Sequence, residues 1–161
     1  MLATIDRIVR AARRHGLEPA LHPHAGTHIE FDDEFAAILD ALDIGLCLDT
    51  GHALYAGLDP VALLHRYAGR LRHLHLKDVD PDVRVRGLGF WDAVAAGAFC
   101  PLGTGLLDLA ALAAALEAIG YRGHATIEQD RRSATPGAPA DDLRRSIDRL
   151  LAVEGAPWRI R

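Results

Sequence analysis

GLCLDTGH, residues 45–52, begins as a strand and ends in residues that carry chemistry. Leu46 and Leu48 alternate with smaller side chains, which is the period-two pattern of a β-strand with one face packed against a core. Asp49 and His52 follow at the point where that strand should end. A buried strand that ends in a carboxylate and an imidazole predicts a ligand site at its carboxyl end.

Three further stretches have the same form, and helical patterns separate them. The predicted strands are 17–22, 44–49, 70–78 and 124–130. The predicted helices are 2–15, a segment capped by Asp32 or Asp33, a segment from Pro60, a segment from Asp108, and a last segment that follows a Pro/Gly/Ala-rich loop and carries Leu143, Ile147 and Leu150. This alternation predicts right-handed βαβ units and a parallel sheet. We therefore expect one α/β domain over residues 1–161, with an irregular stretch at 79–105.

The composition limits the classes of function that fit this sequence. Half of its 161 residues are hydrophobic and a quarter are charged. No apolar run approaches the ~20 residues that a membrane helix needs, so we expect no membrane association. The N-terminal segment is an amphipathic pattern that contains an acid, unlike a signal peptide, which predicts a cytoplasmic protein. The net charge is −4, with basic residues scattered among acids, which argues against nucleic acid as a partner.

Ionisable side chains lie at the carboxyl end of every predicted strand. In strand order they are His22 and His24, Asp49 and His52, His75, Lys77 and Asp78, and Glu128 and Asp130. Asp130 is expected to cap a loop or to support one of the other groups. The carboxyl ends of parallel strands meet at one edge of a sheet or at one mouth of a barrel, where ligands bind. Alternation places the polar side chains opposite the helix-packed face. That pattern favours a barrel interior over a flat sheet with helices on both faces.

Four of these side chains form a donor set for a divalent cation. They offer two imidazole nitrogens and two carboxylates, one from each strand: His22, Asp49, His75 and Glu128. Such a mixed set suits Mn²⁺ or Co²⁺, and also Zn²⁺, better than Mg²⁺ or Ca²⁺. Each residue alone has a structural explanation, since a lone histidine is usually a hydrogen-bonded core residue and Asp49 can cap a turn or a helix. The alignment of four strand ends favours the metal site.

The chain resembles the xylose isomerase-like TIM-barrel superfamily of sugar isomerases, epimerases and dehydratases at four motifs. These are HPHAGT at 22–27, DTGHALYAG at 49–57, HLHLKDV at 73–79 and IEQD at 127–130. Within the superfamily they are most similar to the myo-inosose dehydratase branch, whose matching strand is also rich in histidine. The resemblance runs over nearly the whole chain and implies a TIM (β/α)₈ barrel with parallel strands and outer helices.

The resemblance also implies roles for the strand-end residues. The superfamily holds its metal with Glu, Asp, His and Glu from the fifth to eighth strands, and Asp49, His75 and Glu128 match the last three. His22 stands where most relatives have Glu. His52 matches the histidine of the family's D-x-x-H motif, which usually contacts substrate.

The length of the chain departs from the superfamily. A complete barrel needs about 200 to 250 residues, whereas this sequence predicts four strands. The resemblance therefore implies the C-terminal half of a barrel, strands five to eight, in a chain truncated at its N-terminus. The alternative is a genuine half-barrel that pairs with a second copy as a homo-oligomer, since its first and last strands would expose parallel edges.

The chemistry that the resemblance implies begins with removal of a proton from the carbon next to a carbonyl. A bound cation stabilises the enediolate, which then epimerises, isomerises or loses a β-hydroxyl. Because His22 replaces one of two carboxylate bases, we expect dehydration of a small keto-polyol (inosose dehydratase-like) rather than isomerisation or epimerisation of a sugar.

Five side chains are expected to act on the substrate. Glu128 is a predicted catalytic residue, and His24, His52 or Lys77 is the predicted general acid. The same three residues and Trp91 are the predicted substrate contacts. Lys77 has an alternative role, which is to pair with Asp78 at the surface.

Two other classes of function fit parts of the sequence. A nuclease of the endonuclease IV type shares the barrel and the D-x-x-H ligands, but residues 79–105 contain no histidine and the charge balance is acidic. A non-catalytic half-barrel remnant or binding module would account for the missing strands, and it predicts no metal-dependent turnover.

Overall fold

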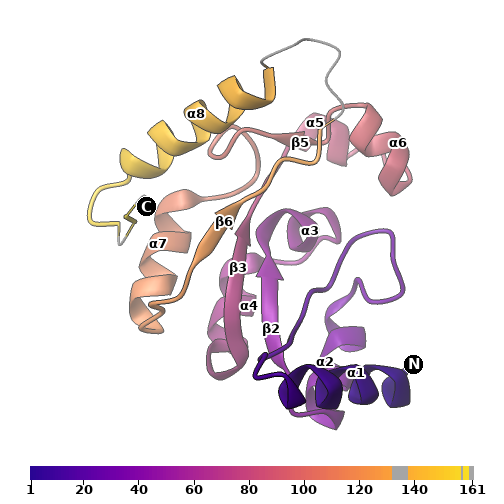
Figure 1. The fold of residues 1–161 in the computed structure, drawn as a ribbon. Coiled ribbons are helices and arrows are strands. Elements are labelled where there is room, and N and C mark those ends of the chain that lie inside the picture. Colours follow the sequence, from indigo (N-terminus) through magenta and orange to yellow (C-terminus); the bar gives the residue numbers. More distant parts are fainter. Residues whose placement is uncertain (132–137, 157, 160–161) are drawn as a thin grey trace.

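The main sheet consists of four parallel strands in chain order. The computed structural model describes residues 1–131, 138–156 and 158–159. The strands are β1 (Ala20–Leu21), β2 (Gly45–Asp49), β3 (Leu71–Leu76) and β6 (Ala125–Ile127), with the order β1-β2-β3-β6. Every neighbouring pair is parallel, which confirms the predicted α/β class with repeated βα units. Figure 1 shows β2, β3 and β6 side by side, with their carboxyl ends directed toward α3 and α5.

The five predicted helices are present, and the described residues contain four further helical segments that were not predicted. Together they are α1 (Leu2–Arg14), α2 (Asp32–Ala41), α3 (Thr50–Tyr55), α4 (Pro60–Arg66), the 3₁₀ helix η1 (Ala68–Arg70), α5 (Pro81–Arg84), α6 (Phe90–Ala95), α7 (Leu109–Ala118) and α8 (Ala138–Leu151). Asp108 caps α7 as predicted, since its carboxylate accepts from two backbone amides of the first turn. Most of the Pro/Gly/Ala-rich loop predicted before the last helix falls on 132–137, outside the described residues.

The predicted cap of α2 is wrong. Asp32 and Asp33 lie inside the first turn, and Phe31 is the residue that precedes the helix. The carboxylate of Glu34 accepts hydrogen bonds from the backbone amides of Glu30 and Phe31, at 2.8 Å and 2.9 Å. A glutamate in the first turn therefore fixes the chain that enters the helix, because its carboxylate binds the amides of the two residues before α2.

The two faces of the sheet differ as the sequence predicts. Leu46 and Leu48 of β2 and Leu74 of β3 are buried in the main core, which α2, α4 and α7 complete. The alternate side chains on these strands lie outside that cluster and include Cys47, Asp49, His73 and His75. This second face is the one that would line the interior of a closed barrel.

The stretch predicted as irregular, 79–105, contains short regular elements. β4 (Asp78–Val79) pairs antiparallel with β5 (Phe99–Cys100), and helices α5 and α6 lie between them. Fully buried Asp78 holds the segment that follows, because its carboxylate accepts from the backbone amides of Val79, Gly103, Gly105 and Leu107. One internal carboxylate thus fixes the chain that leads into α7.

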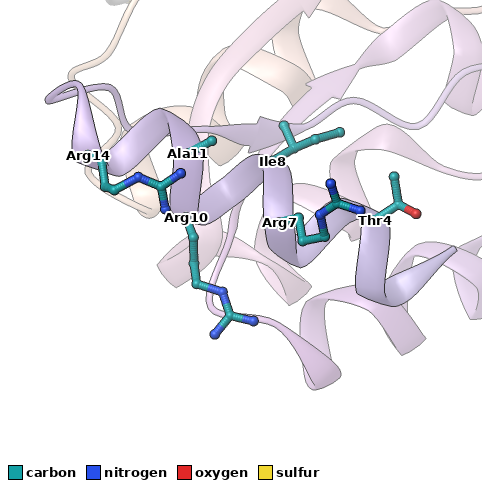
Figure 2. A pocket seen from close by; sticks show the side chains of 6 residues that line it. All are labelled: Thr4, Arg7, Ile8, Arg10, Ala11 and Arg14. Atoms are coloured by element: carbon teal, nitrogen blue, oxygen red, sulfur yellow. The ribbon is translucent and has the colours of Figure 1, made fainter.

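The outer face of α1 carries a pocket that is separate from the strand ends. Its volume is about 400 Å³, and it is lined by Thr4, Arg7, Ile8, Arg10, Ala11 and Arg14. Figure 2 shows the three arginines projecting from the helix, and the residues that line the pocket include none of the predicted site residues. This pocket therefore is not the predicted site. Among the described residues, no helix is both long and apolar enough to cross a membrane.

Candidate active site and metal centre

The carboxyl ends of β2, β3 and β6 bring three predicted metal ligands together. Strand register places Asp49 beside His75, and the backbone amide of Glu128 donates to Leu76 O at 3.0 Å, which extends the pairing one residue past β6. One potential ligand atom from each of Asp49, His75 and Glu128 lies within 4.8 Å of the other two. His75 Nδ1 is 3.7 Å from Asp49 Oδ2 and 2.9 Å from Glu128 Oε1, and atoms at these two separations can share one ion with bonds of about 2 Å.

The atoms that face this point lack ordinary hydrogen-bond partners. Asp49 Oδ2 and His75 Nδ1 are buried and 3.7 Å apart, and neither has a hydrogen-bond partner among the described residues. His75 Nδ1 is also 2.9 Å from Glu128 Oε1, without the geometry of a hydrogen bond. Buried polar atoms without partners are rare, and a cation between them would satisfy both. The donor set and its unpaired atoms fit a divalent metal ion.

The charges around Asp49 support the same reading. Burial alone would raise the pKa of Asp49, but His75 and Lys77 hold it below its usual range, so the carboxylate is ionised. The contact with Asp49 raises the pKa of His75. The other oxygen of Asp49, Oδ1, accepts from the backbone amides of Gly51 and His52 at 2.8 Å and 2.9 Å, which caps α3. Asp49 therefore has one oxygen for the helix and one for a ligand.

His22 lies beside this group and not in its tightest part. Its ring is 4.9 Å from the ring of His75, centroid to centroid, and its Nδ1 is 3.4 Å from Cys47 O. A ring nitrogen of His22 lies within 4.8 Å of ligand atoms of Asp49 and His52. Cys47 is also close, but burial raises the pKa of its thiol to about 12, which leaves it protonated.

His24 and His52 stack on one another next to an aromatic wall. Their ring centroids are 3.7 Å apart, and both rings lie within 6 Å of Phe90, at 5.2 Å and 5.8 Å. Burial lowers the pKa of His52 to about 3, so the imidazole is neutral near pH 7. A neutral His52 suits contact with a hydroxyl group better than the role of a cationic acid.

Lys77 is the only lysine of the chain, and it is buried in this site. Its side chain is 1% exposed, and Nζ lies 2.7 Å from Asp130 Oδ2, 2.9 Å from Glu128 Oε2 and 3.1 Å from Asp49 Oδ2. Burial alone would lower the pKa of Lys77, but these carboxylates raise it overall, so the amine is a cation.

The alternative in which Lys77 pairs with Asp78 at the surface is wrong. Alternation sends the two side chains in opposite directions, and both are buried. Asp78 is engaged by backbone amides, whereas Lys77 faces the site.

Three residues of the site were not among the predicted catalytic, substrate-binding or metal-binding residues. Asp130, for which only a capping or supporting role was predicted, contacts Lys77, and it comes two residues after Glu128, so period two could have placed it on the same side. Thr50 Oγ1 donates to Lys77 O at 2.7 Å and accepts from Lys77 N at 2.9 Å, which ties α3 to the end of β3. Gly51 leaves room for the lysine, because a Cβ there would meet its side-chain carbons at 2.5 to 2.8 Å.

Gly51→Ala is therefore expected to displace Lys77 and to destabilise the fold by about 1–3 kcal/mol. Urea unfolding of the two proteins measures this difference. Gly69→Ala is the matched control, since an added Cβ at Gly69 meets no heavy atom within 4 Å. We expect its free energy of unfolding to stay within about 0.5 kcal/mol of the parent. Equal stability of the two variants would contradict the tight packing of Gly51 on Lys77.

A pocket of about 390 Å³ adjoins the site. It is lined by His24, Phe90, Trp91, Val94, Gln129, Asp130 and Arg131. Phe90 is the buried wall against the two histidines, whereas Trp91 is 76% exposed and packs edge-on against Phe90. The predicted contact of Trp91 with substrate stays a prediction, and its position is on the outer rim of this pocket.

A family model described as xylose isomerase-like TIM barrel matches residues 1–153. The chain belongs to this family. Two curated relatives match most of the chain, and the name of the first agrees with the predicted branch. The inosose dehydratase of Geobacillus kaustophilus is 40% identical over 159 residues, covering 91% of this chain and 52% of the relative. The rhizopine catabolism protein MocC of Rhizobium meliloti is 37% identical over 148 residues, covering 87% of this chain and 46% of the relative. The chain thus spans about half the length of these relatives.

Solved structures of the family have the same fold. The probable 3-DHS dehydratase AsbF of Bacillus anthracis superposes with a TM-score of 0.75 at 18% identity, over 93% of this chain and 55% of that one. The IOLI protein, whose structure has a bound zinc atom, gives a TM-score of 0.70 at 18% identity over 94% of this chain and 54% of that one. These matches confirm the fold of the family, of which this chain contains four βα units.

Proposed function

We propose that this chain carries the metal centre of a divalent-metal-dependent lyase that dehydrates a cyclic keto-polyol of the inosose type. The observation that carries the proposal is the meeting of Asp49, His75 and Glu128 around a point faced by buried atoms without hydrogen-bond partners. The substrate class comes from the curated relatives, which include several inosose dehydratases.

The proposed ligands are Asp49, His75 and Glu128, with His22 as the fourth. Nitrogen and carboxylate donors of this kind favour Mn²⁺ or Co²⁺, and zinc is also suitable, as the metal of the IOLI structure indicates. When bound, the ion would supply Lewis-acid chemistry at a substrate carbonyl and its neighbouring hydroxyl.

The remaining steps belong to side chains of this chain. Glu128 is proposed to take the proton from the carbon next to the carbonyl, and an acid then protonates the β-hydroxyl, which leaves as water. Lys77 is suited to be that acid because it is a buried ammonium, and His24 is the alternative. The 2.9 Å contact between Glu128 Oε2 and Lys77 Nζ lets the captured proton pass to the amine, which restores both groups.

The histidine at position 22, where most relatives have Glu, favours dehydration over epimerisation or isomerisation. A two-base epimerisation needs carboxylates on both sides of the substrate, and His22 occupies one of those positions with an imidazole whose pKa is lowered by burial. The curated relatives point the same way, and they also favour a sugar-related substrate over the nuclease alternative.

The rest of the substrate pocket is proposed to come from outside this chain. Residues 1–161 form four βα units, and the curated relatives are about twice as long. The missing wall would come from an N-terminal half-barrel or from a second copy of this chain. The cytoplasmic location stays a prediction from the sequence.

The test is turnover of an inosose by the metal-loaded chain. We expect loss of water to produce a conjugated diketone, detected by its ultraviolet absorbance, and we expect a chelator to abolish the signal and added Mn²⁺ or Co²⁺ to restore it. Turnover that persists without metal would contradict the metal centre. Conversion to an isomeric keto-polyol would favour the epimerase alternative, and metal binding without conversion would favour a non-catalytic half-barrel.

A further inference from the structure

Lys77 Nζ lies inside a cage that is built like a cation site. Four nitrogen or oxygen atoms surround it: Asp130 Oδ2 at 2.7 Å and His52 Nε2 at 3.1 Å, which accept its hydrogen bonds, and Glu128 Oε2 at 2.9 Å and Asp49 Oδ2 at 3.1 Å, which form ion pairs with it. An ammonium has three hydrogens, so it cannot donate to four acceptors at once. Asp49 Oδ2, which is buried, has no hydrogen-bond partner among the described residues. The cage therefore contains more electron-pair donors than the three hydrogens of an ammonium can engage.

The imidazoles around the cage already present lone pairs to a cation. His52 Nε2 faces the ammonium, so this nitrogen is the acceptor and the proton of the neutral ring is on Nδ1. His24 Nδ1 is 2.8 Å from Ala25 O and donates to it, which leaves Nε2 as the acceptor. Ligand atoms of His24, His52 and Asp130 lie within 4.8 Å of one another. These residues form a second donor group next to Asp49, His75 and Glu128.

The two donor groups meet at the lysine. Glu128 and Asp49 belong to the first group and contact Lys77, while Asp130 and His52 belong to the second and also contact it. Three carboxylates and one ammonium leave two negative charges, which one divalent ion would neutralise. A second divalent ion would need the position that Nζ occupies.

Lysine rather than arginine at position 77 is suited to occupy the position of a metal cation. The chain uses arginine at every other basic position apart from histidine, and it has lysine here alone. An ammonium is a compact point charge, whereas a guanidinium is a broad planar group. Gly51 provides the space through which the lysine stem reaches the cage.

We propose that Lys77, in addition to the role of acid proposed above, occupies the second cation position and thereby restricts the centre to one divalent ion. The proposal rests on the metal centre of the proposed function. It adds that the chain would hold two ions without the lysine: one on Asp49, His75 and Glu128, the other on His24, His52 and Asp130.

Titration of the metal-free chain with Co²⁺ tests this, with bound metal counted by equilibrium dialysis and elemental analysis. We expect the parent to saturate at about one ion per chain and Lys77→Met at about two. The double variant Lys77→Met/Asp130→Asn should return to about one, because it lacks the carboxylate of the second group. Asp130→Asn alone should still bind about one ion per chain. This variant is the control for an effect of the Asp130 substitution on ions bound elsewhere on the surface.

The outcomes separate this inference from the proposed function. A parent that binds no Co²⁺ would contradict the metal centre itself. A parent that binds one ion with Lys77→Met also at one, or a parent that already binds two, would overturn only the role of the lysine. If circular dichroism shows Lys77→Met to be unfolded without metal, Lys77→Gln keeps a neutral donor toward the carboxylates and decides the question by the same count.

Discussion

Glu128→Gln is expected to lower inosose dehydration by about three orders of magnitude, because the amide can neither accept the substrate proton nor bind a cation as a carboxylate does. The substitution keeps size and shape, and the amide oxygen can still accept from Lys77 Nζ, so the fold should persist. The measurement is the rate of ultraviolet absorbance increase at saturating Mn²⁺.

The matched control is Glu117→Gln, which removes an exposed carboxylate from α7 far from the strand ends. It should turn over at the parental rate. If Glu128→Gln keeps more than about a tenth of the parental rate, Glu128 is not the base, and the proton must go to another group.

Asp49→Asn is expected to weaken Co²⁺ binding by at least about a hundredfold while the chain stays folded. Asparagine is also a favourable helix cap, so its side-chain oxygen can still accept from the amides of Gly51 and His52. What is lost is the charge on the oxygen that faces His75. Isothermal titration with Co²⁺ measures the change in affinity directly.

Thermal unfolding gives a second measure of the same loss. An ion present at 100 times its dissociation constant stabilises the folded state by about 2.7 kcal/mol, and Asp49→Asn should lose most of that stabilisation. Asp59→Asn is the control, because Asp59 caps α4 in the same way but is not part of the site. If Asp49→Asn binds Co²⁺ with the same affinity as the parent, Asp49 is not a ligand of the ion.

The sheet and its two faces follow from local patterns in the sequence. The two-residue alternation of side chains along a strand places Leu46 and Leu48 on one face of β2 and Cys47 and Asp49 on the other. The local sequence is therefore sufficient to predict these two faces. Parallel pairing then aligns the strand ends, which is why the sequence predicts the meeting of Asp49 with His75.

The environment of Lys77 depends on contacts that no local pattern contains. Its burial requires Gly51, which leaves space for the side chain, the hydrogen bonds of Thr50 and the carboxylate of Asp130. The first two lie at the start of α3 and the third follows β6, so both segments are distant from Lys77 in the sequence. The elements within 79–105 escape prediction for another reason. Strands of two residues are too short to show a period, and the segment after β5 is held by the carboxylate of Asp78, which lies far earlier in the chain.

The single buried lysine has a practical consequence for studies of binding. Reagents that couple to the side-chain amine of lysine have one target in this sequence, Lys77, and its burial shields it in the folded chain. Immobilisation on a sensor chip through lysine side chains would therefore find no accessible target on the folded residues 1–161, and the chain needs another point of attachment.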